Sequence, residues 1–124
     1  MTSRRLLLVE DEESLARLLS EYLRRLGYAV DSCRSAQCAL DLLQSDPAGY
    51  ALVIADLTLP DMSGDRLLDG IRRRCPDTPV LVASGYPDAG GLCCDSEPAR
   101  FRFLQKPFLP QTLAETVAAM LPLP

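Results

Sequence analysis

Short apolar runs alternate with longer segments of helical periodicity along the whole chain. The apolar runs are too short to be helices, and several stop abruptly at a charged or hydroxyl residue, which is typical of buried parallel strands. We expect strands over residues 6–9, 28–33, 51–55, 80–83 and 101–104. The pattern therefore predicts a sheet whose strands are separated by crossover helices.

Helices are predicted where apolar residues recur at a spacing of three or four. Ser14 is suited to cap the first helix, and Gly27 is suited to end it. Its apolar positions are Leu15, Leu18, Leu19, Tyr22, Leu23 and Leu26. Further helices are expected over residues 35–44, 65–74 and 110–120, the last with Pro110 in its first turn.

The segment between the fourth and fifth strands is a poor helix. Residues 86–99 contain Pro87, Gly90, Gly91 and Pro98, and each of these residue types disfavours a helix interior. We expect the fourth helix to be short or irregular.

Strands that alternate with helices predict a doubly wound, flavodoxin-like parallel sheet, because parallel neighbours need long right-handed crossovers. In the order 2-1-3-4-5 the first and third strands are neighbours at the switch point, where such sheets place their chemistry. Glu10, Asp11 and Asp56 would then meet at one edge, joined by Ser84 and Lys106. Carboxylates this close repel each other, so the cluster indicates a cation or a reaction.

Composition narrows the class. The chain has 124 residues, which predicts one domain over residues 1–124, and a net charge of −4. Its basic residues are scattered except for Arg72, Arg73 and Arg74 at a predicted helix end, where cations favour the dipole; a phosphate or partner patch is the alternative. We expect no nucleic-acid binding, and no run approaches the roughly 20 apolar residues of a membrane helix. A cytoplasmic location is expected.

The cysteines do not predict a metal site. Cys33, Cys38, Cys75, Cys93 and Cys94 form an odd set without C-x-x-C spacing, and the chain has no histidine to complete a mixed zinc site. Most are expected to be small buried side chains. The adjacent pair Cys93 and Cys94 is a weak candidate for redox sensing, since no cation nearby would activate it.

Four motifs, in order, resemble the receiver domain of two-component response regulators, which has the fold of the chemotaxis regulators. They read V-E-D-E-E after the first strand, D-L-T-L-P-D-M-S-G after the third, A-S-G after the fourth and F-L-Q-K-P-F at the fifth. The similarity covers essentially the whole chain. The wording S-G-Y and L-Q-K-P-F leans toward receivers attached to hybrid histidine kinases.

The resemblance implies a phosphorelay function. Asp56 would accept a phosphoryl group from a histidine kinase or a histidine phosphotransfer protein. Asp11, Asp56 and the Thr58 carbonyl would bind Mg²⁺, with Glu10 acting through water, while Ser84 and Lys106 would contact the phosphoryl oxygens. The domain would catalyse its own phosphorylation and dephosphorylation, as a switch and not as a turnover enzyme.

The residues are chemically consistent with that role. A carboxylate can be the nucleophile in phosphoryl transfer if a divalent cation offsets repulsion, and oxygen-only ligands favour Mg²⁺. Lys106 and Ser84 add a positive charge and a hydroxyl donor. Because the chain contains no histidine, the phosphohistidine donor must be another domain or protein.

Several positions depart from the commonest receiver pattern. Glu10 stands where many relatives have Asp, and Ser84 stands where Thr is frequent. Phe103 replaces the usual Tyr as the aromatic expected to turn inward on activation, although a plain core aromatic is the alternative. Leu109 occupies a helix-cap position that favours a polar residue, and the Lys106–Pro107 bond resembles the family's cis peptide.

Three rival functions share parts of this pattern. A flavin carrier would need a hydroxyl- and glycine-rich phosphate loop, yet residues 10–13 are acidic. A haloacid-dehalogenase-type phosphatase would need an acid two residues after its nucleophile, where this chain has Thr58. A pseudo-receiver that takes no phosphate and serves as a scaffold remains the main alternative, against which the complete residue set argues.

Overall fold

The fold is a parallel sheet with helices on both faces. The computed structural model describes residues 5–47, 49–85 and 101–121. Its strands are β1 (Arg5–Val9), β2 (Ala29–Cys33), β3 (Leu52–Asp56), β4 (Val80–Ser84) and β5 (Phe101–Gln105). Its helices are α1 (Glu13–Arg25), α2 (Ala36–Ser45), α3 (Gly64–Arg74) and α4 (Pro110–Met120). Each expected strand is present, with bounds shifted by a residue at one or both ends.

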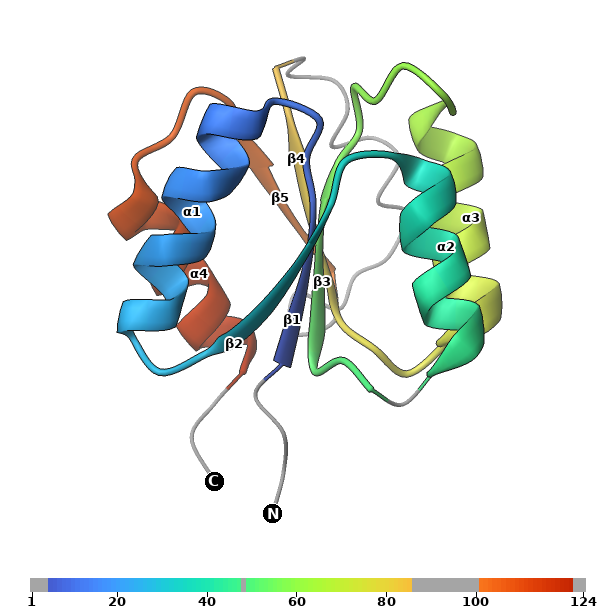
Figure 1. The fold of residues 1–124 in the computed structure, drawn as a ribbon, viewed down its shortest axis with the longest axis horizontal. Coiled ribbons are helices and arrows are strands. Elements are labelled where there is room, and N and C mark those ends of the chain that lie inside the picture. The colour runs from blue at the N-terminus through green and yellow to red at the C-terminus, as the bar shows by residue number, and fades with distance from the viewer. Residues whose placement is uncertain (1–4, 48, 86–100, 122–124) are drawn as a thin grey trace.

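The strand order is β2-β1-β3-β4-β5, and every neighbouring pair is parallel. In the register of the central pair, Val9 of β1 lies opposite Ala55 of β3. The residues that follow these two positions, Glu10 and Asp56, therefore leave the sheet side by side. The predicted doubly wound fold and its strand order are confirmed, and the strands' carboxyl ends lie at the upper edge of Figure 1.

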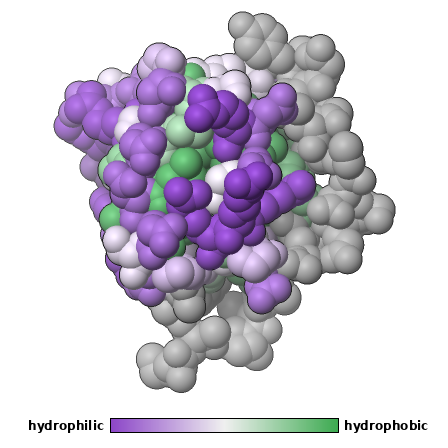
Figure 2. Space-filling model, turned by 90° about the vertical axis from the view of Figure 1, so that its right-hand side faces the viewer, coloured by the Kyte–Doolittle hydropathy of each residue, from purple (hydrophilic) through white to green (hydrophobic). Residues whose placement is uncertain are grey.

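Two hydrophobic layers hold the helices on the sheet. Helices α2 and α3 cover one face and α1 and α4 cover the other (Figure 1). The central strands are buried throughout, because each strand supplies apolar side chains to both layers. The outer face over α2 and α3 is largely hydrophilic (Figure 2), as expected for amphipathic surface helices.

Local capping sets where α1 begins, and the Ser14 prediction was wrong. The N-cap is Glu12, whose carbonyl accepts the first intrahelical hydrogen bond from Ala16 N–H at 2.9 Å. Ser14 therefore lies inside the first turn, where its hydroxyl cannot act as a cap. The short connection from β1 starts the helix as soon as the chain leaves the acidic strand end, and no side chain caps it.

The end of α1 follows the prediction closely. Gly27 has φ of 102°, in the left-handed region that favours glycine. Its N–H donates to the Arg24 carbonyl at 3.0 Å, and Tyr28 N–H donates to the Leu23 carbonyl at 3.2 Å. These two bonds form a Schellman motif, and the buried Leu23 and Tyr28 side chains belong to the same apolar layer.

The arginine triplet has structural partners, as its position at the end of α3 predicts. Arg73 pairs with Asp69 at 2.9 Å, and Arg74 donates to the Gly70 carbonyl at 3.1 Å. The Arg72 guanidinium lies 4.9 Å from the centre of the Phe101 ring. All three arginines lie in the last turn of α3, where the helix-end interpretation places them.

Other expectations fall on different parts of the chain. The weak fourth helix and the pair Cys93 and Cys94 lie outside the described residues. Leu109 is the N-cap of α4, makes no side-chain capping bond and is 67% exposed, as expected for an apolar residue there. Within residues 5–47, 49–85 and 101–121, no helix has the length and apolar character needed to span a bilayer.

Candidate functional site

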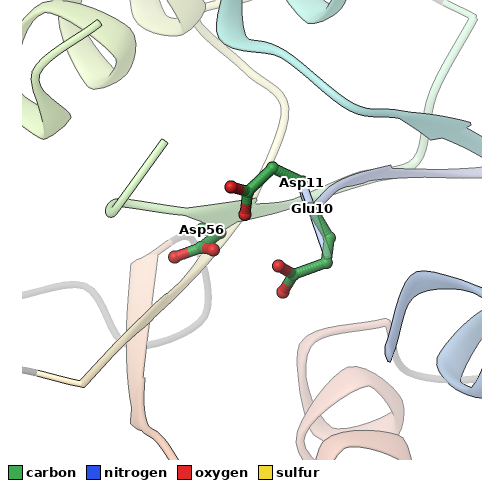
Figure 3. A group of neighbouring side chains, drawn as sticks. All are labelled: Glu10, Asp11 and Asp56. Carbon is green, nitrogen blue, oxygen red and sulfur yellow. The ribbon is translucent and has the colours of Figure 1, made fainter. Parts of the chain in front are cut away.

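Three acidic residues meet where β1 and β3 end. Glu10 and Asp11 directly follow β1, and Asp56 is the last residue of β3. Each carboxylate contributes an oxygen, and these oxygens lie within 4.8 Å of one another (Figure 3). Glu10 and Asp56 are each 3% exposed, whereas Asp11 is exposed. The parallel register thus brings together the acids that the sequence places 45 residues apart, from 11 to 56.

Lys106, which directly follows the edge strand β5, contacts two of these acids. Its Nζ lies 2.8 Å from Glu10 Oε1 and 3.1 Å from Asp56 Oδ2. It is the only lysine in the printed sequence, where every other basic side chain is arginine. A compact ammonium can donate to two carboxylates at once in a space where a planar guanidinium would need more room.

Thr58 fixes the orientation of the Asp56 carboxylate. Oδ1 of Asp56 accepts a hydrogen bond from the Thr58 amide at 3.0 Å and another from the Thr58 hydroxyl at 2.7 Å. The other oxygen, Oδ2, accepts from Lys106. With both oxygens hydrogen-bonded, the carboxylate has a defined plane before any ligand arrives.

Burial and hydrogen bonding act in opposite directions on the pKa values. Burial raises the pKa of Asp56, but the Thr58 hydrogen bonds and the charge of Lys106 outweigh it and hold that pKa below its ordinary value. For Glu10, burial prevails and raises the pKa, with the Asp56 charge adding to it. Burial lowers the pKa of Lys106, yet its two carboxylate partners reverse this and raise it. Asp56 is thus held as an anion beside a charged ammonium.

Ser84 and Phe103 come from the neighbouring strands. Ser84 ends β4, is 1% exposed, and its carbonyl accepts a hydrogen bond from Lys106 N–H at 2.7 Å. Phe103 pairs with Val82 in the β4–β5 register and is half-buried against the α2–α3 layer. The Lys106–Pro107 peptide is cis, as the motif predicts. The predicted site residues therefore lie at or beside the carboxyl edge of the sheet, except Phe103, which is in the middle of β5.

The donor set suits a hard cation. The acid cluster offers only carboxylate oxygens, and Asp11 leaves one side of it exposed. Oxygen ligands with an open side that waters can occupy are the arrangement that Mg²⁺ prefers. The arrangement can therefore hold a divalent cation next to a hydrogen-bonded, anionic carboxylate.

Comparison with known proteins identifies the family. A family model described as the response regulator receiver domain matches residues 6–118. The chain belongs to the response regulator receiver family. Receiver domains act in two-component phosphorelay signalling with histidine kinases or phosphotransfer proteins, and they bind Mg²⁺ at an acidic pocket.

Two curated proteins illustrate the similarity of this receiver domain to longer chains. Sensor kinase CckA of Brucella abortus is 36% identical over 118 residues, which cover 93% of this chain and 12% of that protein. Response regulator protein FleR of Pseudomonas aeruginosa is 34% identical, with coverage of 92% and 24%. This chain therefore spans a quarter or less of either relative.

Solved receivers share the whole architecture. The receiver domain of the hybrid histidine kinase CckA superposes with a TM-score of 0.80 at 31% identity, covering 94% of this chain and 98% of that one. The signal receiver domain of a putative LuxO repressor protein from Vibrio parahaemolyticus gives a TM-score of 0.82 at 34% identity, with coverage of 96% and 90%.

Two roles in this receiver domain were not foreseen from the sequence. Thr58 was singled out for its carbonyl, whereas its amide and hydroxyl hold Asp56. Asp61, quoted only as part of a motif, accepts from the Ala36 and Gln37 amides of α2, each at 3.1 Å. These bonds lower the pKa of Asp61 and tie the loop after Asp56 to the helix N-terminus. The sequence shows only an acidic residue in the loop after Asp56, and this does not predict that its partners are amides of α2.

Proposed function

We propose that Asp56 is the phosphoacceptor of this receiver, taking a phosphoryl group from a phosphohistidine on a separate kinase or phosphotransfer domain. The observation that carries the proposal is the Lys106 ammonium placed 3.1 Å from Asp56 and 2.8 Å from Glu10. A buried carboxylate held as an anion, with a cation beside it, matches the needs of an aspartyl nucleophile.

The transfer of the phosphoryl group needs no reactant besides the phosphohistidine and Asp56. An Asp56 carboxylate oxygen attacks phosphorus, a P–O bond forms, and the P–N bond to the donor imidazole breaks with its electron pair returning to nitrogen. The product is an acyl phosphate on Asp56. The donor must be another domain or protein, because this chain contains no histidine.

Glu10, Asp11, Asp56 and the Thr58 carbonyl are the groups that would hold Mg²⁺. When bound, the ion offsets the repulsion between the phosphoryl oxygens and the carboxylates. Asp11 is exposed, so its carboxylate can exchange hydrogen bonds with water for a bond to the ion. Glu10 is buried and is fixed by its contacts with Lys106 and with the Glu12 amide, the latter at 3.2 Å. Glu10 is therefore suited to act through water.

Ser84 and Lys106 would contact the phosphoryl oxygens of the product. The Ser84 hydroxyl donates toward the new negative charge, and movement of this side chain frees space that Phe103 can enter from the adjacent strand. Phe103 has no ring hydroxyl, so its inward position would depend on packing alone. The surface of β5 and its flanking segments would then change with phosphorylation.

Treatment with acetyl phosphate and Mg²⁺ tests the proposal. Intact mass spectrometry is expected to show a gain of one phosphoryl group in the wild type, and none in Asp56→Asn. The control is Asp69→Asn, which removes an exposed carboxylate paired with Arg73 on α3 and keeps the acid cluster. The wild type could also stay unmodified, with an NMR spectrum that does not change when beryllofluoride and Mg²⁺ are added. The domain would then be a scaffold of the pseudo-receiver type.

The similarity to the CckA receiver supports a hybrid histidine kinase as the setting of this domain. Phosphotransfer profiling against the kinases and phosphotransfer proteins of the source organism identifies the donor. A donor that phosphorylates this chain much faster than the others is the expected result, and equal slow transfer from all of them would contradict a dedicated relay.

A further inference from the structure

Two thiols face each other where β2 passes into α2. Cys33 is the last residue of β2 and is 1% exposed, whereas Cys38 lies in the first turn of α2 and is exposed. Their Sγ atoms are 3.2 Å apart. A disulfide needs about 2.05 Å between sulfurs, so a small side-chain movement would join them. Two cysteines separated by four intervening residues give no such signal in the sequence.

We propose that Cys33 and Cys38 form a redox-active pair, in which a hydroperoxide oxidises Cys38 and Cys33 then closes a reversible disulfide onto it. This modification is chemically independent of phosphoryl transfer at Asp56. It requires one exposed thiol that meets the oxidant and one sheltered thiol within reach of it, and the two cysteines differ in that way.

The chemistry proceeds in two balanced steps. The Cys38 sulfur attacks one peroxide oxygen, the O–O bond breaks, and Cys38 becomes a sulfenic acid while the remaining oxygen leaves as an alcohol or water. The Cys33 sulfur then attacks the Cys38 sulfur, and the hydroxyl leaves as water with the Cys33 proton. Two thiols have lost two electrons to the hydroperoxide, and an S–S bond has formed.

Burial assigns the two roles. Cys33 is 1% exposed, so a hydroperoxide in solution does not reach its sulfur directly. Cys38, in the first turn of α2, is an exposed residue. Oxidation therefore begins at Cys38, and Cys33 is positioned to resolve it.

The disulfide would join two segments that are hydrogen-bonded to the loops of the acid pocket. The Cys33 carbonyl accepts the Glu10 N–H at 2.9 Å, and Asp61 from the loop after Asp56 holds the first amides of α2. The Cys38 amide itself donates to the Ser35 hydroxyl at 3.1 Å. A covalent link between Cys33 and Cys38 would thus restrain the backbone on which both the pocket and α2 depend.

Peptide mapping after oxidation tests the pair. The full chain carries Cys93→Ser and Cys94→Ser, so that only the cysteines of the described residues remain. It is treated with hydrogen peroxide, alkylated and cut with trypsin. Cleavage after Arg34 puts Cys33 and Cys38 on separate peptides, so a linked species is diagnostic. We expect that species, two hydrogens lighter than the sum of its parts, and its loss on treatment with dithiothreitol.

Matched variants separate the two roles. Cys38→Ser is expected to lose the linked peptides, and Cys33→Ser is expected to stop at a Cys38 sulfenic acid that dimedone traps. Cys33→Ala provides a second buried replacement should serine destabilise the fold. Cys75→Ser is the control, because the Cys75 thiol donates to the Ile71 carbonyl at 3.2 Å and lies on another element.

Three outcomes would overturn the proposal. Cys33 and Cys38 could both stay reduced, and so be alkylated, after peroxide exposure sufficient to oxidise glutathione. The linked peptides could contain Cys75 in place of either residue. Cys38→Ser could lose thiols to peroxide as fast as the parent protein. Each result would show that the 3.2 Å approach of the sulfurs is ordinary packing.

Discussion

Asp56 and Glu10 are equally buried, yet their pKa values shift in opposite directions. The difference lies in the donors around them: Asp56 accepts two hydrogen bonds from Thr58 in addition to Lys106, whereas Glu10 accepts one from the Glu12 amide and one from Lys106. The extra donors outweigh burial at Asp56 and do not at Glu10. Neighbouring groups, more than depth, therefore decide which acid is held as an anion.

Millimolar Mg²⁺ is expected to raise the melting temperature of the chain, because the ion binds the folded acid cluster and not the unfolded chain. At ten times its Kd it would add about 1.4 kcal/mol to the free energy of unfolding. Differential scanning calorimetry with and without Mg²⁺ measures the shift. Asp11→Asn removes one ligand and should reduce it, while Asp69→Asn should retain it. A melting temperature that ignores Mg²⁺ would contradict the site.

At the scale of the element, helix termini decide how the strands are joined. Two side chains accept hydrogen bonds from the N-terminal amides of α2. One is the N-cap residue Ser35, and the other is Asp61, in the loop that follows β3. The C-terminus of α1 is closed by the Schellman bonds around Gly27, which turn the chain directly into β2. One end thus depends on a distant side chain and the other on backbone conformation alone.

Gly27→Ala is expected to lower the free energy of unfolding by about 1 to 2 kcal/mol, the cost of a side chain at a left-handed residue. Among residues 5–47, 49–85 and 101–121, a Cβ at Gly27 would meet no atom within 4 Å, so the loss would report backbone strain and not a clash. Urea denaturation of the variant and the wild type measures the difference.

Gly85→Ala is the matched control for stability. A Cβ there also meets no atom of the described residues within 4 Å, and Gly85 does not have a positive φ. Its effect should lie within about 0.5 kcal/mol of zero. Equal losses in the two variants would show that the backbone at Gly27 is not the cause.

At the scale of the whole molecule, polar clusters lie at both ends of the sheet. The acid pocket lies at the carboxyl ends, and a second cluster forms near the start of β1. There Asp31 of β2 accepts hydrogen bonds from Tyr50 at 2.8 Å and from Arg5 Nε at 3.0 Å, and the Arg5 guanidinium lies 4.6 Å from the centre of the Tyr50 ring. This cluster joins β1, β2 and the residues before β3, and it has no place in the proposed chemistry.

This second cluster predicts an acid-dependent loss of stability. The Tyr50 hydrogen bond and the Arg5 contacts hold the folded pKa of Asp31 below its ordinary value of 3.8. A depressed pKa contributes stability that is present above the unfolded value and is lost as pH falls through the folded value. Wild-type unfolding free energy should therefore fall more steeply below pH 3.8 than that of Asp31→Asn.

Urea denaturation at a series of acidic pH values measures the two slopes. Tyr50→Phe removes the hydrogen bond that contributes most to the shift and should give an intermediate slope. Identical slopes for the wild type and Asp31→Asn would show that the cluster does not favour the ionised carboxylate.

The fold and most of the candidate site could be predicted from local patterns. Apolar runs marked every strand, and the residues that end them included Asp56, Ser84 and, through a following loop, Lys106. Errors arose where two local signals competed: Ser14 is a good capping residue, but the carbonyl of Glu12 begins α1 two residues earlier. Residues 86–99 have only a weak helical pattern and lie outside the described residues.

The sequence by itself determined which segments are buried and which polar residues end the strands, because periodicity and residue type act over a few neighbouring positions. Only the tertiary structure decided that Lys106 bridges Glu10 and Asp56, that Asp61 caps α2, and that the sulfurs of Cys33 and Cys38 touch. These contacts depend on strand register, crossover path and side-chain direction together. Each is set by packing across the whole molecule, so no local pattern encodes it.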